Sequence, residues 1–156
     1  MSIKPTRQID ADEARYFLNE ASEAGVVVSI STAGSGTSMD SAANLITVKG
    51  ASSGALPVGM LVNEFVDIDE TRFPVNWNKD QANKGSKATV MTKGWLVTDK
   101  VVGSNDLAGK QAVLASSGFV ASKATNGTHN EVSTPTVGRF RTDVDEDGYA
   151  AVYIDL

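Results

Sequence analysis

Short runs of β-forming residues separated by glycine turns are the feature that most limits what this chain can fold into. The strongest example lies near its end, where residues 136–142 and 149–154 flank the acidic turn Asp145-Glu-Asp-Gly148. An Asp-Gly pair between two alternating runs is a strong hairpin signal, because glycine accepts the positive φ that a tight turn requires. We therefore expect a β-hairpin at this position.

Similar runs cover most of the chain. Two further hairpins are expected, one at Thr92-Lys-Gly94 between residues 87–91 and 95–98, and one at Ser116-Ser-Gly118 between residues 111–115 and 119–121. Other short strands are expected at residues 26–30, 45–48, 57–62 and 66–69. About eight to ten short strands without alternating helices predict a mainly β protein, a small barrel or sandwich of antiparallel strands.

The first 25 residues differ from the rest, because they carry more charged and bulky side chains. Asp10 followed by Glu13 is similar to a helix capping box, and Gly25 suits a helix end. Four apolar residues share one helical face: Ala14, Phe17, Leu18 and Ala21. The alternative is an extended arm that becomes ordered against a partner. Both alternatives divide the chain into an N-terminal arm, 1–25, and a β-rich body, 26–156.

Composition limits the classes of partner. The net charge is −5, and the basic residues are scattered singly, whereas nucleic-acid binding normally needs a basic face. No apolar run approaches the roughly 20 residues that span a bilayer, and the first residues lack the apolar stretch of a secretory signal. We therefore expect no direct contact with nucleic acid, no membrane insertion and synthesis in the cytoplasm.

The chain offers few candidate residues for catalysis. The chain has no cysteine, and its one histidine, His129, lies in a polar stretch without a nucleophile beside it. Asp67 and Asp69 alternate along one run, which is typical of carboxylates on the solvent face of a strand. The sequence predicts a protein that is not an enzyme and holds no cofactor.

The acidic turn also resembles the start of a calcium-binding loop. Asp143, Asp145 and Asp147 occupy the first, third and fifth positions, and Gly148 occupies the sixth. The twelfth position, where such loops carry a bidentate glutamate, is Ile154. We interpret the segment as an acidic hairpin turn, with weak calcium binding by the three aspartates as the alternative.

Aromatic residues are scarce, at 6% of the chain, so each one is of interest. Trp95 begins an expected strand, which is typical of a residue in the core or at its rim. Phe73 and Trp77 lie in a segment between strands, and they are candidates either for anchoring that loop or for contacting a neighbouring subunit. The candidate interface residues are Tyr16, Phe17, Phe73 and Trp77.

Parts of the chain resemble virion proteins of tailed bacteriophages. The stretch Leu56-Pro-Val-Gly-Met-Leu-Val-Asn-Glu-Phe-Val-Asp-Ile-Asp69, followed by Asn76-Trp-Asn-Lys-Asp80 and by residues 85–99, carries this resemblance. The ending resembles phage head-decoration (cement) proteins, with Pro135-Thr-Val-Gly-Arg-Phe140 and residues 145–156. The resemblance covers residues 26 to 156 and consists of strand and turn signals rather than chemistry.

The resemblance implies a structural role in the virion. It implies a homotrimer on the outer capsid surface that clamps neighbouring major capsid proteins against the pressure of packaged DNA, with residues 1–25 reaching along the shell. Such a protein is made in the cytoplasm of the bacterial host. Two alternatives stay open. One is another virion component, such as a connector, tail or head fibre, and the other is a carbohydrate- or surface-binding module that uses Phe73, Trp77 and Tyr16.

Overall fold

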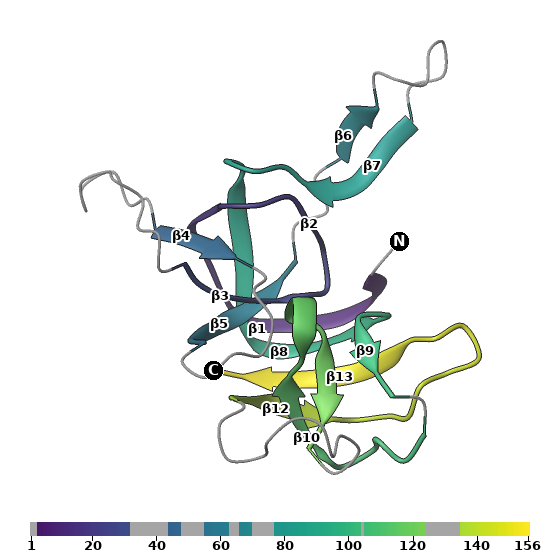
Figure 1. Ribbon diagram of the computed structural model, residues 1–156. Coiled ribbons are helices and arrows are strands. Elements are labelled where there is room, and N and C mark those ends of the chain that lie inside the picture. Colours follow the sequence, from purple (N-terminus) through teal and green to yellow (C-terminus); the bar gives the residue numbers. More distant parts are fainter. Residues whose placement is uncertain are drawn as a thin grey trace.

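The computed structural model describes residues 3–31, 44–47, 55–62, 66–69, 77–103, 105–123 and 135–156, and in these residues it is mainly β-structure (Figure 1). The only helical segment among them is the single 3-10 turn Ser116–Gly118. The strands are β1 (Ile3–Leu18), β2 (Ser22–Glu23), β3 (Val27–Ile30), β4 (Asn44–Thr47), β5 (Pro57–Leu61), β6 (Val66–Asp69), β7 (Trp77–Ala82), β8 (Lys87–Thr98), β9 (Val101–Val102), β10 (Gln111–Leu114), β11 (Val120–Ser122), β12 (Thr136–Phe140) and β13 (Ala150–Asp155). The expected mainly β fold is confirmed.

Ten of these strands form one strongly curled sheet, which wraps into a half-barrel. Their order is β1-β4-β3-β5-β8-β13-β12-β10-β11-β9, and β1 also pairs with β8. The extra pairing closes a circuit of five strands, β1-β4-β3-β5-β8. The remaining strands continue the sheet from β8 towards the C-terminal half. A smaller group, β2-β7-β6, stands beside the main sheet.

The 12-residue strand β8 is the centre of the sheet. One of its edges pairs with β1, from Ile3 opposite Thr98 to Phe17 opposite Lys87. Its other edge is shared, because β5 pairs at Met91 and Val90, and β13 pairs over residues 93–98. Both edges of β8 are therefore hydrogen-bonded to other strands, which leaves no open edge at the middle of the sheet.

The hydrophobic core lies on both sides of the central strands. Val27 and Met60 face one buried cluster, whereas their neighbours Val28 and Leu61 face another, and all four side chains are fully buried. Side chains alternate between the two faces of a strand, so a strand with consecutive buried residues must be covered on both faces. The larger cluster continues under the C-terminal strands, where Phe140 is almost completely buried.

Two of the expected hairpins are confirmed. β12 and β13 pair as antiparallel neighbours, and the acidic turn between them closes through the Gly148 N–H, which donates to the Asp145 carbonyl. β10 and β11 also pair as antiparallel neighbours around the 3-10 turn that ends at Gly118. In both turns the glycine has a positive φ, as the sequence pattern requires.

The hairpin expected at Thr92-Lys-Gly94 is wrong, since β8 runs straight through these residues. Gly94 serves a different purpose. Its φ is +140°, and a Cβ atom there would lie 2.3 Å from the carbonyl oxygen of Gln8 in β1. Ile9 pairs with Gly94 and Ala11 with Lys93, so Asp10 is the extra residue of a β-bulge. The glycine marks a close backbone approach at this bulge, a role that glycine in a strand often has.

The helix considered for residues 10–24 is not formed, because residues 3–18 are the strand β1. The capping pattern at Asp10 and Glu13 is a local preference, and the pairing of β1 along β8 together with burial of Ile3 and Leu18 outweighs it. The division into an arm, 1–25, and a body, 26–156, stays a prediction, but β1 lies within the main sheet rather than beside it.

Replacing Gly94 tests the close approach of β1 and β8. We expect Gly94→Ala to lower the free energy of unfolding by more than about 2 kcal/mol, because the added Cβ must displace backbone. The control is Gly109→Ala, since Gly109 has a positive φ but no atom within 4 Å of an added Cβ. It should cost only about 1 kcal/mol of backbone strain. Urea unfolding measures both, and equal losses would contradict the bulge as the cause.

Removing residues 1–24 tests whether the N-terminal segment is separable. The truncation deletes every β1 contact of β8 and the buried side chains of Ile3 and Leu18. We expect the remaining chain to lose cooperative unfolding or most of its stability, as judged by circular dichroism during a urea titration. A truncated chain that unfolds at the same urea concentration as the full one would show that the body folds by itself.

Candidate functional site

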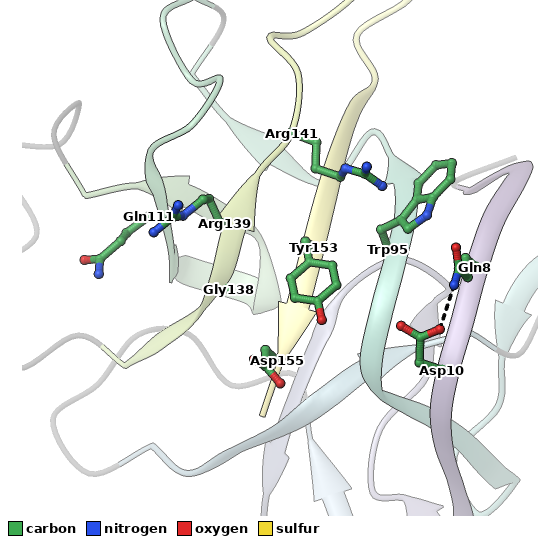
Figure 2. A pocket seen from close by; sticks show the side chains of 9 residues that line it. All are labelled: Gln8, Asp10, Trp95, Gln111, Gly138, Arg139, Arg141, Tyr153 and Asp155. Atoms are coloured by element: carbon green, nitrogen blue, oxygen red, sulfur yellow. Dashed lines mark hydrogen bonds between the residues drawn. The ribbon is translucent and has the colours of Figure 1, made fainter.

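Five side chains form one row across five strands of the main sheet. Gln111 of β10 pairs with Arg139 of β12, which pairs with Tyr153 of β13. Tyr153 pairs with Trp95 of β8, and Trp95 pairs with Gln8 of β1. We call this set the transverse row, and Figure 2 shows its members side by side.

Alternation along the strands explains why these side chains face outward. Val152 and Ile154 are fully buried, so Tyr153 between them points to the opposite face of the sheet. Leu96 is fully buried in the same way, and its neighbour Trp95 points outward. Both aromatic side chains are half-buried, which leaves part of each ring accessible to a ligand.

The transverse row lines a shallow concavity of about 630 Å³. Its remaining walls come from Asp10 on the β1 bulge, from Arg141 after β12 and from Asp155 at the end of β13. Gly138 of β12 also borders it, and a Cβ atom at that position would lie 1.9 Å from the carbonyl oxygen of Tyr153. The close packing of β12 on β13 therefore depends on a glycine here.

The charged groups of this concavity differ in whether they have a hydrogen-bond, ion-pair or aromatic partner. The Arg141 guanidinium lies 5.0 Å from the centre of the Trp95 ring, within the range of a cation–π interaction. Asp10 accepts a 2.8 Å hydrogen bond from the Gln8 amide, drawn in Figure 2. Asp155 lies 3.3 Å from the Lys93 ammonium, and this hydrogen bond raises the pKa of Lys93. Arg139 is exposed and has no carboxylate partner among the residues that the structure describes.

The groups around this concavity are of kinds that bind ligands. Two aromatic rings, two guanidinium groups, two amides and two carboxylates offer stacking surfaces and hydrogen bonds. The residues that line the concavity include no serine, threonine, cysteine or lysine nucleophile beside a base. Within the described ranges, no three histidine, cysteine or acidic residues lie close enough together to hold a metal ion.

The aspartates of the acidic turn bind backbone N–H groups, and Asp143 and Asp145 do so at different places in the chain. Asp143 accepts hydrogen bonds from the backbone N–H groups of Leu107 and Ala108, at 2.6 and 2.9 Å. Asp145 accepts from the N–H groups of Asp147 and Tyr149, at 3.1 and 2.8 Å. The two carboxylates therefore satisfy different segments of backbone. This is the expected acidic hairpin turn, and the weak calcium binding of the alternative stays a prediction.

A lysine from the other end of the chain closes this turn. The Lys4 ammonium lies 2.7 Å from Asp145 and 3.6 Å from Asp147, and it sits 4.4 Å from the centre of the Tyr149 ring. These contacts connect the start of β1 to the β12–β13 turn. They add to the pairing of β1 with β8 as a link between the two ends of the sequence.

The predicted interface residues fall in three different situations. Tyr16 is half-buried against the cluster of Leu18 and Val28, and its hydroxyl donates to Glu13 at 3.1 Å. Phe17 is half-buried at the end of β1. Trp77 begins β7 opposite Asp69 of β6. Phe73 and His129 lie outside the described residues. The interface role of these aromatics stays a prediction.

The hairpin of β6 and β7 is a second candidate surface. It extends away from the main sheet in Figure 1. β6 pairs with no other described strand than β7, over Val66–Asp69, and β7 is held in turn by the two residues of β2. The hairpin joins the body through the Lys84–Gly85 turn that leads into β8.

No protein-family model matches the chain, and no curated protein matches it. In the part of the chain that the structure describes, no helix is long and apolar enough to cross a membrane.

Sequence reasoning missed the transverse row. It placed Trp95 in the core or at its rim, and it assigned no role to Tyr153 or Arg139. The alternation of Tyr149, Ala151, Tyr153 and Asp155 does indicate one outward face. Which strands lie beside β13 depends on pairings between residues far apart in sequence, and local patterns do not specify these.

Acidification tests the role of the turn carboxylates. The N–H groups of Ala108 and Leu107 hold the pKa of Asp143 below its usual range, and the hydrogen bond from Lys4 lowers the pKa of Asp145. Carboxylates with lowered pKa stabilise the fold above their unfolded pKa of about 4, and this contribution is lost as the pH falls through the folded pKa. Asp143→Ala and Asp145→Ala should thus lower the urea midpoint at neutral pH, with a smaller deficit in acid.

Glu146→Ala is the matched control in the same turn, since Glu146 is exposed and its carboxylate has no partner among the described residues. Its urea midpoint should equal that of the unmodified protein at both pH values. A deficit of the aspartate variants that is unchanged by acid would contradict the electrostatic explanation.

Proposed function

We propose that this protein is a structural subunit of a tailed-phage virion, a decoration subunit on the outer surface of the head that binds the major capsid protein. The resemblance of residues 26–156 to virion and head-decoration proteins supports the role. The observation that carries it furthest is the β6–β7 hairpin, which extends away from the main sheet (Figure 1).

The hairpin has the physical character of an attachment device. A two-stranded hairpin by itself is only marginally stable in water, because too little apolar surface is buried to offset the entropy of ordering. β6 has one strand neighbour in the described part of the chain. Contact with a coat subunit supplies the missing partner, so that ordering of the hairpin and attachment to the shell stabilise each other.

Several weak attachments act together in the proposed homotrimer. Each subunit contacts a different coat protein, and after the first contact the others form at a high effective concentration. The trimer thereby clamps neighbouring capsid proteins and opposes the outward pressure of the packaged DNA. This function requires binding surfaces and a stable body, and it requires no chemistry.

The position of the hairpin separates attachment from the transverse row. The hairpin enters β8 at Lys87, whereas the row crosses β8 at Trp95. Eight residues of extended strand correspond to about 26 Å along β8. A subunit anchored through the hairpin therefore has its aromatic row at a distance from the anchor.

Trp77 is the residue whose replacement tests attachment. Trp77→Ala should weaken binding to phage heads prepared without this protein by at least about tenfold, as expected for an aromatic anchor at an interface. Co-sedimentation with the heads measures the binding. Trp95→Phe is the control, because it removes the other tryptophan of the chain, and its binding should equal that of the unmodified protein.

Equal attachment by both variants would contradict the hairpin as the anchor. Absence of the protein from purified particles of the virus that encodes it would contradict the proposed function altogether. Sedimentation equilibrium tests the trimer independently, with an expected mass three times that of the 156-residue chain.

A further inference from the structure

We propose that the concavity over the transverse row binds an oligosaccharide that carries carboxylate groups, with uronic or sialic acids as the class of sugar. This site lies on the main sheet and not on the hairpin, so it goes beyond the proposed attachment to a capsid. Its elements are two adjacent aromatic rings, two arginines and a set of short polar side chains.

The aromatic pair supplies a stacking platform. Trp95 and Tyr153 are directly opposite each other on neighbouring strands, and both are half-buried. Their neighbours along the strands, Leu96, Val152 and Ile154, are fully buried on the opposite face. The core therefore anchors the backbone that carries both rings and keeps them on the outward face, which lowers the entropy lost on binding. The C–H face of a pyranose ring is apolar and packs on such a ring face, while its hydroxyl groups extend to the sides.

The arginines supply recognition of a carboxylate. Arg139 flanks Tyr153 in the row, and Arg141 stacks on Trp95. Stacking leaves the N–H edge of a guanidinium free to donate, and a guanidinium matches a carboxylate with two parallel hydrogen bonds. The carboxylates of the same concavity already have partners, since Asp10 is bound by Gln8 and Asp155 by Lys93. Arg139 is exposed and has no carboxylate partner in the described ranges, so its N–H groups are available to an anionic ligand.

The polar ends of the row suit sugar hydroxyls. Gln111 and Gln8 stand at its two ends, and an amide both donates and accepts hydrogen bonds, as a hydroxyl group does. Asp10, carried by the β1 bulge, adds a further acceptor. With strands about 4.8 Å apart, a row across five strands extends over roughly 19 Å. That length and a volume of about 630 Å³ suit an oligosaccharide better than a single ring.

The charges disfavour a nucleic acid in the same place. Asp10 and Asp155 border the concavity, and the whole chain has a net charge of −5. A polyphosphate backbone binds through an uninterrupted basic surface. Two arginines among two aspartates and two amides suit isolated carboxylates that are spaced by neutral hydroxyl groups.

The experiment is a titration of the intact protein with tetragalacturonate, with a hyaluronan tetrasaccharide and with 3′-sialyllactose. The readout is the NMR signal of the Trp95 indole N–H, identified by its loss in Trp95→Phe and its retention in Trp77→Phe. We expect at least one of the three to shift this signal with a Kd of about 1 mM or tighter. The neutral methyl ester of tetragalacturonate and neutral lactose should bind at least about tenfold more weakly than their acidic counterparts, because they lose the charge-assisted bonds.

Matched arginine variants locate the carboxylate. Arg139→Gln and Arg141→Gln should each weaken binding by at least about tenfold. Arg7→Gln should have no effect, because Arg7 of β1 pairs with Leu96 and so belongs to the opposite face. Unchanged chemical shifts of the tryptophan indole N–H signals in the ligand-free spectra verify that the variants remain folded.

Three outcomes would overturn the proposal. The first is the absence of any shift of the Trp95 signal with all three acidic oligosaccharides. The second is equal affinity for the acidic and neutral forms, which would mean that the aromatic rings bind the sugar but the arginines do not recognise its carboxylate. The third is an equal shift with a short aspartate-rich peptide, which would assign the arginines to a protein partner. None of these results bears on attachment to phage heads through Trp77, so the two proposals fail separately.

Discussion

The pairing of β8 along both of its edges is the interaction on which the rest of the structure depends. β1 occupies one edge over almost the whole strand, while β5 and then β13 occupy the other. The first half of β8 belongs to a closed circuit of five strands, and its second half carries the C-terminal strands. Gly94 stands between the halves, where the β1 bulge brings the two backbones close together. One strand therefore belongs to both halves of the sheet.

This architecture separates two surfaces that have different chemistry. The β6–β7 hairpin leads into the start of β8, and the transverse row crosses its second half at Trp95. Under our proposals the hairpin attaches the subunit to a phage head, and the row recognises acidic sugars at the other end of the strand. Val152 and Ile154, which are fully buried on either side of Tyr153 in sequence, anchor the backbone that carries this member of the row. A rigid platform is what a weak saccharide site requires, since an exposed site of this kind has little binding energy to spend on ordering its own side chains.

The sequence indicates local features more accurately than long-range ones. The mainly β class and the hairpins at Gly118 and Gly148 follow from turn chemistry that involves only a few neighbouring residues. Gly94 shows the limit, because a glycine between two β-forming runs suggests a turn, and only the approach of β1 reveals that it lies within a strand. The same holds for the helix considered near Asp10 and for the row through Tyr153. Both depend on β1 and β13 lying beside β8, and these partners are far apart in the chain.

Native-state hydrogen exchange followed by NMR tests the central place of β8 most directly. Amides that open only on global unfolding exchange slowest, and the measurement gives a free energy of opening for each one. We predict that the paired amides of β8 on both sides of Gly94 form the slowest group, together with their partners in β1 and β13. Fast exchange throughout β1 beside slow exchange in β13 would contradict the account, because it would mean that the N-terminal strand is an appendage and that β8 holds the fold through one edge alone.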